Sequence, residues 1–420
     1  MDLKSRLSQL QAQTGSAAAP AATTALRKRL AQLRPERLHA HMQPPSRAMP
    51  VSVLADKLGG ELLGEGMIRI RSQISLANRL GRIDLQSLRE YPRLPGERDT
   101  PRRRPVYLDT ETTGLSGGSG TLAFLVGLAV VEADCIRLTQ FLLTRFAAEA
   151  ALLAALGADL SQQDLLVSYN GKSYDLPLLH TRFRMQGMNS PFDGLPHLDL
   201  LHPVRRLFAS QWPDCRLTRL EQQLLGFSRS NDLPGSEAPA AWFSYIRDGH
   251  GDRLTRVVDH NRQDIVSLAV AHHALAQAIE QPGTFAIDPY ALARWLADTD
   301  RAAARRLLQS HEPGLGDDGK RLLGRLLRLD GDWHAAIRIW EGLAAGGCRD
   351  SLERLAKYHE HVSRDLAAAR RCCSLLPPGP EQQQRRKRIE RKLQRQAMAA
   401  GGIPQGEPGC ARPPVRPDTP

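Results

Sequence analysis

Two carboxylates, Asp109 and Glu111, stand two residues apart after a short apolar run, in the stretch Asp-Thr-Glu-Thr-Thr-Gly. Side chains alternate along a strand, so both are expected to project to the same face. Ionised carboxylates that close repel each other unless they are protonated or bridged by cations. Hard divalent ions that prefer oxygen ligands, Mg²⁺ or Mn²⁺, are the natural bridge. An Asp-x-Glu pair alone is common on surface strands, but the apolar run before it and Thr-Thr-Gly after it make this pair a candidate metal site.

A third carboxylate, Asp175, lies in the first turn of a helix that the pattern predicts over residues 174–186. This helix follows a short buried strand expected over residues 164–169, and Ser173 is placed to cap it. A carboxylate in a first turn is favoured by the helix dipole and stays ionised. Taken alone, Asp175 is also compatible with an ordinary helix-start aspartate.

The fourth carboxylate, Asp264, follows His260 by four residues on a long amphipathic helix expected over residues 253–278. That spacing puts both side chains on one helix face. A lone His–Asp pair of this kind is usually solvated or caps a helix. This pair gains weight because it follows the other acidic elements in order.

Neighbouring polar residues are weaker candidates for substrate contacts. Thr112 and Thr113 could position a substrate strand through hydroxyl and backbone donors. Asn170 and Tyr174 could contact the scissile phosphate or a terminal nucleotide, although Asn170 could equally just make a turn. Asp199 is compatible with an approach to bound metals from behind or with a structural role at a strand end.

The elements that must hold these residues follow a definite order. Three strand-like runs without an intervening helix predict an antiparallel meander, after which helices alternate with short strands. This order predicts an α/β fold with a mixed sheet flanked by helices. The expected strands are residues 106–108, 122–132, 135–146, 164–169 and 197–201, and the expected helices are residues 147–160, 174–186, 217–225 and 253–278.

The acidic elements, in this order and with these neighbours, resemble the three motifs of the DEDD 3′–5′ exonuclease superfamily. More narrowly, the chain resembles the YprB-type ribonuclease-H-like domain over about residues 103–280. The helix over residues 217–226 and the loop over residues 233–242 also look typical of that branch. The resemblance implies a ribonuclease-H-like mixed sheet.

The resemblance also implies hydrolysis of phosphodiester bonds with two divalent metal ions, Mg²⁺ or Mn²⁺. By carry-over, Asp109 bridges both metals, Glu111 and Asp264 complete the first site, and Asp175 holds the second, partly through water. His260 would orient or deprotonate the attacking water, because imidazole titrates near neutral pH.

One spacing departs from the family pattern. The His subgroup of the superfamily usually has its histidine five residues before the last aspartate, whereas the Tyr subgroup has its tyrosine four before. This chain has His260 at the four-back position and Asp259 at five. The general-base role of His260 is therefore less defined than the metal ligands.

Residues 285–378 have a different pattern. Three similar segments begin with Asp300, Asp332 and Asp365, a spacing near 33 residues, and each aspartate stands where a helix N-cap belongs. The repeat resembles tetratricopeptide helical repeats, which would offer a surface to a protein partner or guide the substrate strand. A plain helical bundle with chance similarity is the alternative.

Charge and the remaining segments set broader limits. The net charge of +12 favours a polyanionic partner, either nucleic acid or an anionic membrane surface, and the arginines within 102–104 and 182–184 could contact phosphate. Residues 1–45 and 379–420 are expected to be disordered, apart from a basic helix over 385–395. Residues 46–102 form a segment without an assigned role, with a short helix expected over residues 51–58 and a strand over residues 67–70.

Location follows from absences in the sequence. No run approaches a membrane span, no signal-peptide core is evident, and the six cysteines show no CxxC spacing. A cytoplasmic protein without a membrane partner is expected. Together these observations predict a metal-dependent nuclease, best described as a 3′–5′ exonuclease on single-stranded DNA or RNA. A non-catalytic nucleic-acid-binding or scaffold protein and a structure-specific endonuclease remain the alternatives.

Overall fold

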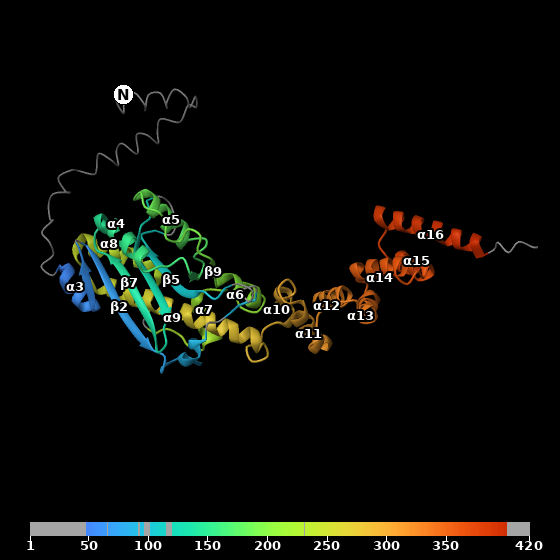
Figure 1. The fold of residues 1–420 in the computed structure, drawn as a ribbon, viewed down its shortest axis with the longest axis horizontal. Coiled ribbons are helices and arrows are strands. Elements are labelled where there is room, and N and C mark those ends of the chain that lie inside the picture. Colours follow the sequence, from blue (N-terminus) through green and yellow to red (C-terminus); the bar gives the residue numbers. More distant parts are fainter. Residues whose placement is uncertain are drawn as a thin grey trace, which may run out of the picture.

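The computed structural model describes residues 48–64, 66–90, 93–95, 101–114, 120–230 and 232–400. The disorder expected for residues 1–45 and for residues 401–420 lies outside this part of the chain. An α/β domain built on a seven-stranded sheet is followed by an all-helical region that extends away from it (Figure 1). The expected fold class is therefore confirmed.

The sheet is mixed, as expected. Its centre is the antiparallel meander of β5, β6 and β7, and the shorter strands β8 and β9 continue the sheet parallel to β5. The strand order is β1-β2-β7-β6-β5-β8-β9. Their bounds are Arg104–Thr112 for β5, Ala123–Val131 for β6, Cys135–Leu143 for β7, Asp164–Ser168 for β8 and His197–Asp199 for β9.

The segment before residue 103, which the sequence left without a role, supplies one edge of this sheet. Strand β2 (Met67–Ser75) pairs antiparallel with β7 along its whole length, and β1 (Gly60–Leu63) forms the edge beyond it. The helix expected at residues 51–58 is present as α3 (Val51–Leu58). A second, two-stranded sheet of β3 (Arg79–Leu80) and β4 (Ile83–Asp84) leads into a short 3₁₀ helix.

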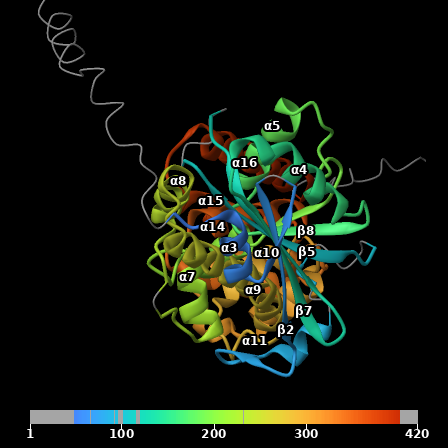
Figure 2. The same ribbon diagram turned by 90° about the vertical axis from the view of Figure 1, so that its left-hand side faces the viewer.

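Two apolar cores cover the two faces of the sheet, and strand β5 shows how they divide. Val106 and Leu108 belong to one core, whereas Tyr107 between them belongs to the other. Figure 2 looks along the molecule, with the helical region behind the twisted sheet. The helices of the domain are α4 (Glu149–Ala158), α5 (Asp175–Met185), α6 (Leu201–Phe208), α7 (Leu217–Leu220) with a following π turn (Glu221–Leu225), α8 (Ala238–Asp248) and α9 (Asp252–Glu280).

Two details of this domain differ from expectation. The predicted Ser173 cap was wrong, because the residue before α5 is Tyr174 and makes no side-chain capping bond. The backbone turn replaces the cap, since the Leu176 amide already donates to the Gly171 carbonyl at 3.0 Å. Helices α6 and α8 were not predicted; α8 begins within residues 233–242, which the sequence indicates as loop.

The helical region consists of helices that pack against their neighbours in the chain and share a core around Trp340. Asp300, Asp332 and Asp365 each accept a bond from the backbone amide three residues on, so the predicted caps are confirmed. The helices are α10 (Pro289–Leu296), α11 (Arg301–Ser310), α12 (Asp317–Leu329), α13 (Trp333–Ala345), α14 (Arg349–His361), α15 (Leu366–Ser374) and α16 (Pro380–Ala400).

Helix α16 corrects the expectation of a disordered tail. The helix expected over residues 385–395 is longer, Pro380–Ala400. Its Ile389 is fully buried against Leu366, Ala369 and Cys373 of α15. One apolar contact on an otherwise charged helix is easy to miss in the sequence, because its pattern resembles that of a solvated segment.

Candidate active site

The end of strand β5 carries the first two carboxylates. Asp109 and Glu111 share the strand face of Tyr107, which packs in the core on the α9 side, and Thr110 between them lines the same pocket at the strand end. The β5–β6 register shifts between Glu111 and Thr112, which marks a bulge at the site. Bulges bend a strand and re-aim its side chains, as a site at a strand end requires.

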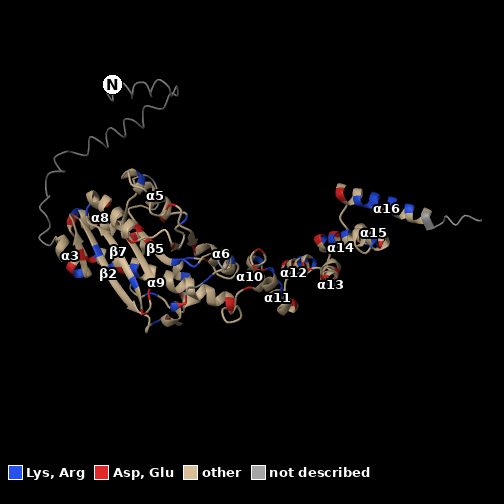
Figure 3. Cartoon of the chain, in the orientation of Figure 1, with Lys and Arg blue, Asp and Glu red and all other residues tan. Residues whose placement is uncertain are grey.

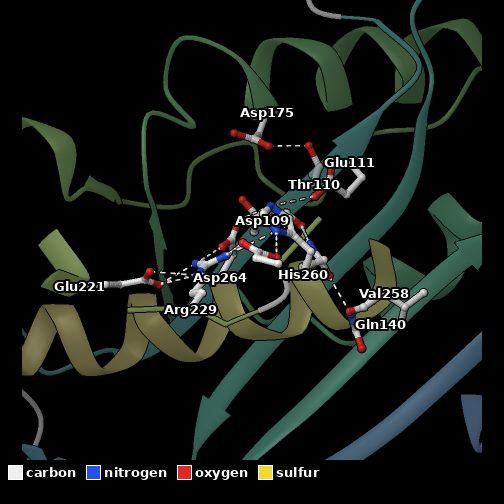
Figure 4. A network of polar contacts seen from close by, with 12 residues as sticks. Asp109, Thr110, Glu111, Gln140, Asp175, Glu221, Arg229, Val258, His260 and Asp264 are labelled. Carbon is white, nitrogen blue, oxygen red and sulfur yellow. Dashed lines mark hydrogen bonds and ion pairs between the residues drawn. The ribbon is translucent and has the colours of Figure 1, made fainter. Parts of the chain in front are cut away.

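Asp109 is fixed by a buried amide network (Figure 4). Asn261, fully buried on α9, donates through Nδ2 to the Asp109 carboxylate at 2.8 Å and accepts at 2.8 Å from the Gln140 amide of β7. Gly127 pairs with Asp109 in the register, and a Cβ there would meet the Ile265 side chain at 2.1 Å and the Asn261 Oδ1 at 2.4 Å. The missing side chain at Gly127 lets α9 lie close enough to reach Asp109.

Asp175 reaches the same strand end from α5. The Thr110 hydroxyl donates to its carboxylate (Figure 4). The two carboxyl-bearing elements are thus joined by a side chain that the sequence did not single out. Asp175 also interacts electrostatically with Asp109, because its charge raises the pKa of the Asp109 carboxyl.

Asp199 stabilises the turn that precedes α5. Its carboxylate is buried and accepts from the backbone amides of Asn170 at 2.7 Å and Lys172 at 3.1 Å. Asn170 itself has φ of 66°, a left-handed conformation that asparagine tolerates better than most residues. Of the two roles open for Asp199, the contacts favour the structural one. Asn170 both makes the turn and lines the site pocket.

His260 and Asp264 face Glu111 from α9. The His260 Nε2 atom lies 3.5 Å from Asp264 Oδ2 and 3.9 Å from Glu111 Oε1. Among the described residues, these three form a group whose ligand atoms all lie within 4.8 Å of one another. The spacing of four residues therefore brings the imidazole to the acidic centre despite its departure from the family pattern.

The loop before α8 adds residues that the sequence analysis missed. Arg229, almost fully buried, binds the Glu221 carboxylate at 2.5 Å and also pairs with Asp264 (Figure 4). Asp232 lies 2.6 Å from His260 Nδ1. Although burial by itself raises it, the pKa of Asp232 is lowered overall by its hydrogen bond with His260, so this carboxylate is ionised and can only accept. His260 therefore carries its Nδ1 proton toward Asp232, and its Nε2 atom faces the acidic centre.

The four carboxylates and His260 line one pocket of about 310 Å³. Thr113 is the exception among the predicted site residues: its hydroxyl accepts from the Leu122 amide at 2.9 Å, and it is not part of the lining. The predicted residues that line the pocket are Asp109, Glu111, Thr112, Asn170, Tyr174, Asp175, His260 and Asp264.

Most of the arginines proposed for phosphate contacts instead bind acceptors within the domain. Arg104 binds the Asp164 carboxylate through two nitrogens at 2.8 and 2.9 Å, and Arg182 pairs with buried Glu149. Arg103 donates to a backbone carbonyl at 2.9 Å. These guanidinium groups stabilise the domain, because each faces an acceptor of its own chain.

The carboxylates perturb one another strongly. Burial raises the pKa of Asp109 well above its usual range, and the charges of Asp264, Asp175 and Glu111 raise it further. Burial and the charge of Asp264 raise the pKa of Glu111 to about 8, and burial raises that of Asp175 to about 6. Without a cation, part of this cluster is therefore protonated at neutral pH.

The donor set fits divalent cations. Buried carboxylates that repel one another in one pocket are stabilised by hard cations with oxygen ligands, such as Mg²⁺ or Mn²⁺. Asp109, Glu111, Asp175 and Asp264 are the residues that would hold them. His260 is the additional donor within reach of Glu111 and Asp264.

Comparison with known proteins points the same way. Residues 106–275 match a family described as the RNase_H superfamily. The chain is 34% identical over 281 residues to "Uncharacterized protein YprB" of Bacillus subtilis (strain 168), a match that covers 63% of this chain and 66% of that protein. The chain thus spans just under two thirds of that relative.

Among solved structures, the family B DNA polymerase of Pyrobaculum calidifontis is 13% identical, with a TM-score of 0.34, over 55% of this chain and 29% of that one. A TM-score of that size does not establish a shared fold. In the part of the chain that the structure describes, no helix is long and apolar enough to cross a bilayer.

Proposed function

We propose, from the premise that residues 106–275 form a ribonuclease-H-superfamily domain, that this protein is a metal-dependent nuclease. More finely, we propose a 3′–5′ exonuclease of the DEDD type that acts on single-stranded DNA or RNA. The observation that carries the proposal is the meeting of Asp109, Glu111, Asp175 and Asp264 in one pocket, although they come from three distant segments of the chain.

The cations supply positive charge for the phosphate and acidity for a nearby water when they are bound. The protein residues have separate tasks in this proposal. Asp109 and Glu111 hold the centre from the strand, and Asp175 and Asp264 hold it from the two helices. His260 accepts a proton at Nε2 while Asp232 keeps the opposite nitrogen protonated.

The shape of the pocket supports a strand end as substrate. A volume of about 310 Å³ suits a single nucleotide rather than a duplex. Tyr174 is 59% exposed at the start of α5 and offers its ring to a terminal base. Thr112 and Asn170 line the same pocket and offer polar groups to the phosphate or sugar, whereas a substrate role for Thr113 lacks support from the pocket lining.

Three finer features belong to the same proposal. The Asp-capped helices at a spacing near 33 residues support tetratricopeptide-like repeats over residues 285–378, with a protein partner as one use. We propose residues 103–280 as the catalytic unit, to which the preceding segment adds edge strands. Five described cysteines are free, which supports a reducing cytoplasm as the location.

A panel of end-labelled substrates tests the proposal. Single- and double-stranded DNA and RNA, labelled at the 5′ end, are incubated with Mg²⁺ or Mn²⁺ or with a chelator. A metal-dependent ladder of shortened products is expected, whereas discrete internal cuts would indicate an endonuclease. No cleavage of any substrate, with either metal, would overturn the proposal.

Matched variants make the panel specific. Asp264→Asn should abolish cleavage, because it removes a carboxylate from the acidic centre. Asp259→Asn makes the same charge change on the same helix at a side chain that is 62% exposed, and it should cleave like the native chain. Equal cleavage by both variants would assign the activity to a contaminant.

A further inference from the structure

A second pocket lies in the helical region, far from the acidic centre along the chain. It has a volume of about 440 Å³ and is lined by four helices, α12, α13, α14 and α16. We call it the C-terminal groove. Its lining combines three aromatic rings with more cations than carboxylates: Trp333, Trp340 and Tyr358, the cations Arg328, Arg354, Lys357, Arg385 and Arg388, and the carboxylates Asp350 and Glu353.

Aromatic rings form one wall of the C-terminal groove. The rings of Trp333 and Tyr358 have centroids 5.3 Å apart and are tilted by 34°, and Trp333 meets Trp340 edge-on at 6.5 Å. Trp340 is buried in the helical core, whereas Trp333 and Tyr358 remain partly exposed in the groove. Exposed aromatic faces are the stacking platforms that single-stranded nucleic acids use.

Two cations in the C-terminal groove have no protein counter-ion. Arg328 and Lys357 form no ion pair with any residue that the structure describes, whereas Arg354 and Arg388 of the same lining pair with Asp350 and Glu360. The Nε atom of Arg328 is buried without a hydrogen-bond partner. A buried donor without a partner is costly, and a ligand oxygen would satisfy it.

Two cations of the groove lining, Arg385 and Arg388, share one buried carboxylate with Lys392, which lies outside the lining. The buried carboxylate of Glu360 lies 3.4 Å from Arg385, 2.6 Å from Arg388 and 2.9 Å from Lys392. One carboxylate cannot neutralise three cations, so the group keeps a positive charge. This charge is fixed in place, because Glu360 anchors α16 on α14.

The surrounding surface continues this charge along α16 (Figure 3). Residues 349–398 contain 13 Lys and Arg against 6 Asp and Glu, whereas residues 103–280 contain 16 against 19. Lys387, Arg391 and Arg395 are exposed at intervals of four residues and therefore share one helix face. A polyanion is attracted to this region rather than to the face of the α/β domain.

We propose that the C-terminal groove binds single-stranded nucleic acid, with a base against Trp333 and Tyr358 and phosphates at Arg328 and Lys357. The combination favours a polynucleotide over an acidic peptide, because every nucleotide of a strand joins a flat ring to a fixed negative charge. The binding itself is independent of the chemistry in the α/β domain. That the bound strand is also the substrate rests on the proposed function.

Oligonucleotide binding by the full chain tests the proposal. The measurement is made in a chelator, so that the strand is not cleaved. Fluorescence anisotropy of labelled oligo-dT and oligo-U is measured for the native chain and variants. Trp333→Ala and Tyr358→Ala should each weaken binding about fivefold or more. Trp333→Phe keeps a ring and should bind nearly as the native chain does, which separates stacking from misfolding. Thermal unfolding of each variant checks the fold.

The salt dependence of oligonucleotide affinity tests the phosphate contacts proposed for Arg328 and Lys357. Replacing Arg328 and Lys357 together by Ala should reduce the slope of log affinity against log salt by about 1.4, the value for two lost phosphate contacts on a single strand. The matched control replaces Arg325 and Arg338, which are exposed on the same stretch of chain but lie outside the groove lining, and it should change the slope by less.

The outcomes separate the two proposals. If every groove variant binds oligonucleotides as the native chain does, the proposal that the C-terminal groove binds them is overturned, even if cleavage persists. Binding of polyglutamate, lost in Trp333→Ala, with no binding of oligonucleotides would assign the groove to an acidic peptide and also overturn it. Intact, Trp333-dependent oligonucleotide binding without cleavage under any metal condition would instead overturn the proposed nuclease and support the groove.

Discussion

The α/β domain and the helical region distribute their charged residues in opposite ways. In the α/β domain the acidic side chains of the candidate site point inward to one pocket, and Arg104, Arg182 and Arg229 each pair with a buried carboxylate. In the helical region cations face outward along α14 and α16 (Figure 3). An inward acidic centre suits chemistry on a phosphate, and an outward basic surface suits holding many phosphates. The comparison suggests that the two tasks occupy separate parts of the chain.

The two regions also differ in how they fix their charged groups. Three residues of the site each have a supporting contact of their own: Asn261 for Asp109, Arg229 for Asp264 and Asp232 for His260. The helical region relies on one buried carboxylate, Glu360, shared by several cations. Substitutions should therefore have sharp effects on rate in the first region and graded effects on binding or docking in the second.

The largest expected effect tests whether the regions are separable. Glu111→Gln should lower the rate of nucleotide release about a thousandfold or more, because a carboxylate that holds the cations is lost. Oligonucleotide binding in a chelator should stay near the native value, since the C-terminal groove is untouched. Release rate and anisotropy on the same preparation measure both. A rate near that of the native chain would remove Glu111 from the centre.

The next effect concerns stability against pH. Burial and Asp264 raise the pKa of Glu111 to about 8, and an unfolded chain has glutamates near about 4.3. The native state therefore holds a proton that the unfolded chain releases, and the stability gained from it is lost as pH rises through this window. Without metal, unfolding free energy should fall by a few kcal/mol, as an order of magnitude, from about pH 5 to pH 8.

Thermal melts in a chelator, with and without added Mg²⁺, measure this loss. Mg²⁺ should restore the melting temperature at pH 8 and do little at pH 5, because protons and cations compete for the same carboxylates. Glu111→Gln should flatten the dependence on pH. A melting temperature that rises steadily with pH in the chelator would contradict the assignment.

A smaller effect is expected for the loop that supports His260. Asp232→Asn should lower the turnover rate about 10- to 100-fold with little change in KM, because the imidazole loses the acceptor that fixes its tautomer. Steady-state kinetics on a short labelled strand measure both constants. Glu237→Gln, at a 44% exposed side chain near the same loop, is the matched control and should behave like the native chain. Equal effects from both variants would point to general loop damage.

The smallest expected effect concerns the attachment of α16. Glu360→Gln should weaken the docking of α16 by about 1–2 kcal/mol, because partly exposed cations keep much of their hydration. Although burial by itself raises it, the pKa of Glu360 is lowered to about 2, chiefly by its hydrogen bonds from Arg388 and Lys392. The anchor is therefore present above about pH 4.5 and lost as pH falls toward 2.

Hydrogen exchange of the α16 amides measures that docking. Exchange should speed up in Glu360→Gln while the strands of the α/β domain exchange as before. Glu390→Gln, which removes a partly exposed carboxylate paired with Arg386 on the same helix, should leave exchange unchanged. Faster exchange in the sheet as well would contradict the separation of the two regions.

Much of the α/β domain was predictable from pattern alone. The meander and the long helix α9 have strong periodic signals, and Asp109, Glu111 and Asp264 lie on those elements, whereas Asp175 begins the predicted helix α5. A residue fixed on a regular element can be placed before the tertiary structure is known, because the period of the element sets the direction of its side chain.

The missed residues lack such a signal. Arg229 and Asp232 lie in an irregular loop, so their contacts with α9 depend on how that loop folds back. Asn261 had a usable signal, since it is polar and lies three residues before Asp264 on an otherwise apolar helix face. Strand β2 was predicted too short, because its polar residues after Ile70 alternate on a half-exposed sheet edge. Thr113 was misjudged because the bulge at the end of β5 changes the alternation there.

The absence of a side chain at Gly127 sets the distance between two halves of the site. Even one methyl group at this position would collide with Asn261 and Ile265 and push α9 outward from β5. Asp264 would retreat with the helix while Asp109 stayed on the strand, so the gap available to a bridging cation would widen. Gly127 therefore sets the spacing between Asp109 on β5 and Asp264 on α9, although it contributes no side chain to the site. Under the proposed function, a wider spacing would hold a small ion such as Mg²⁺ less well.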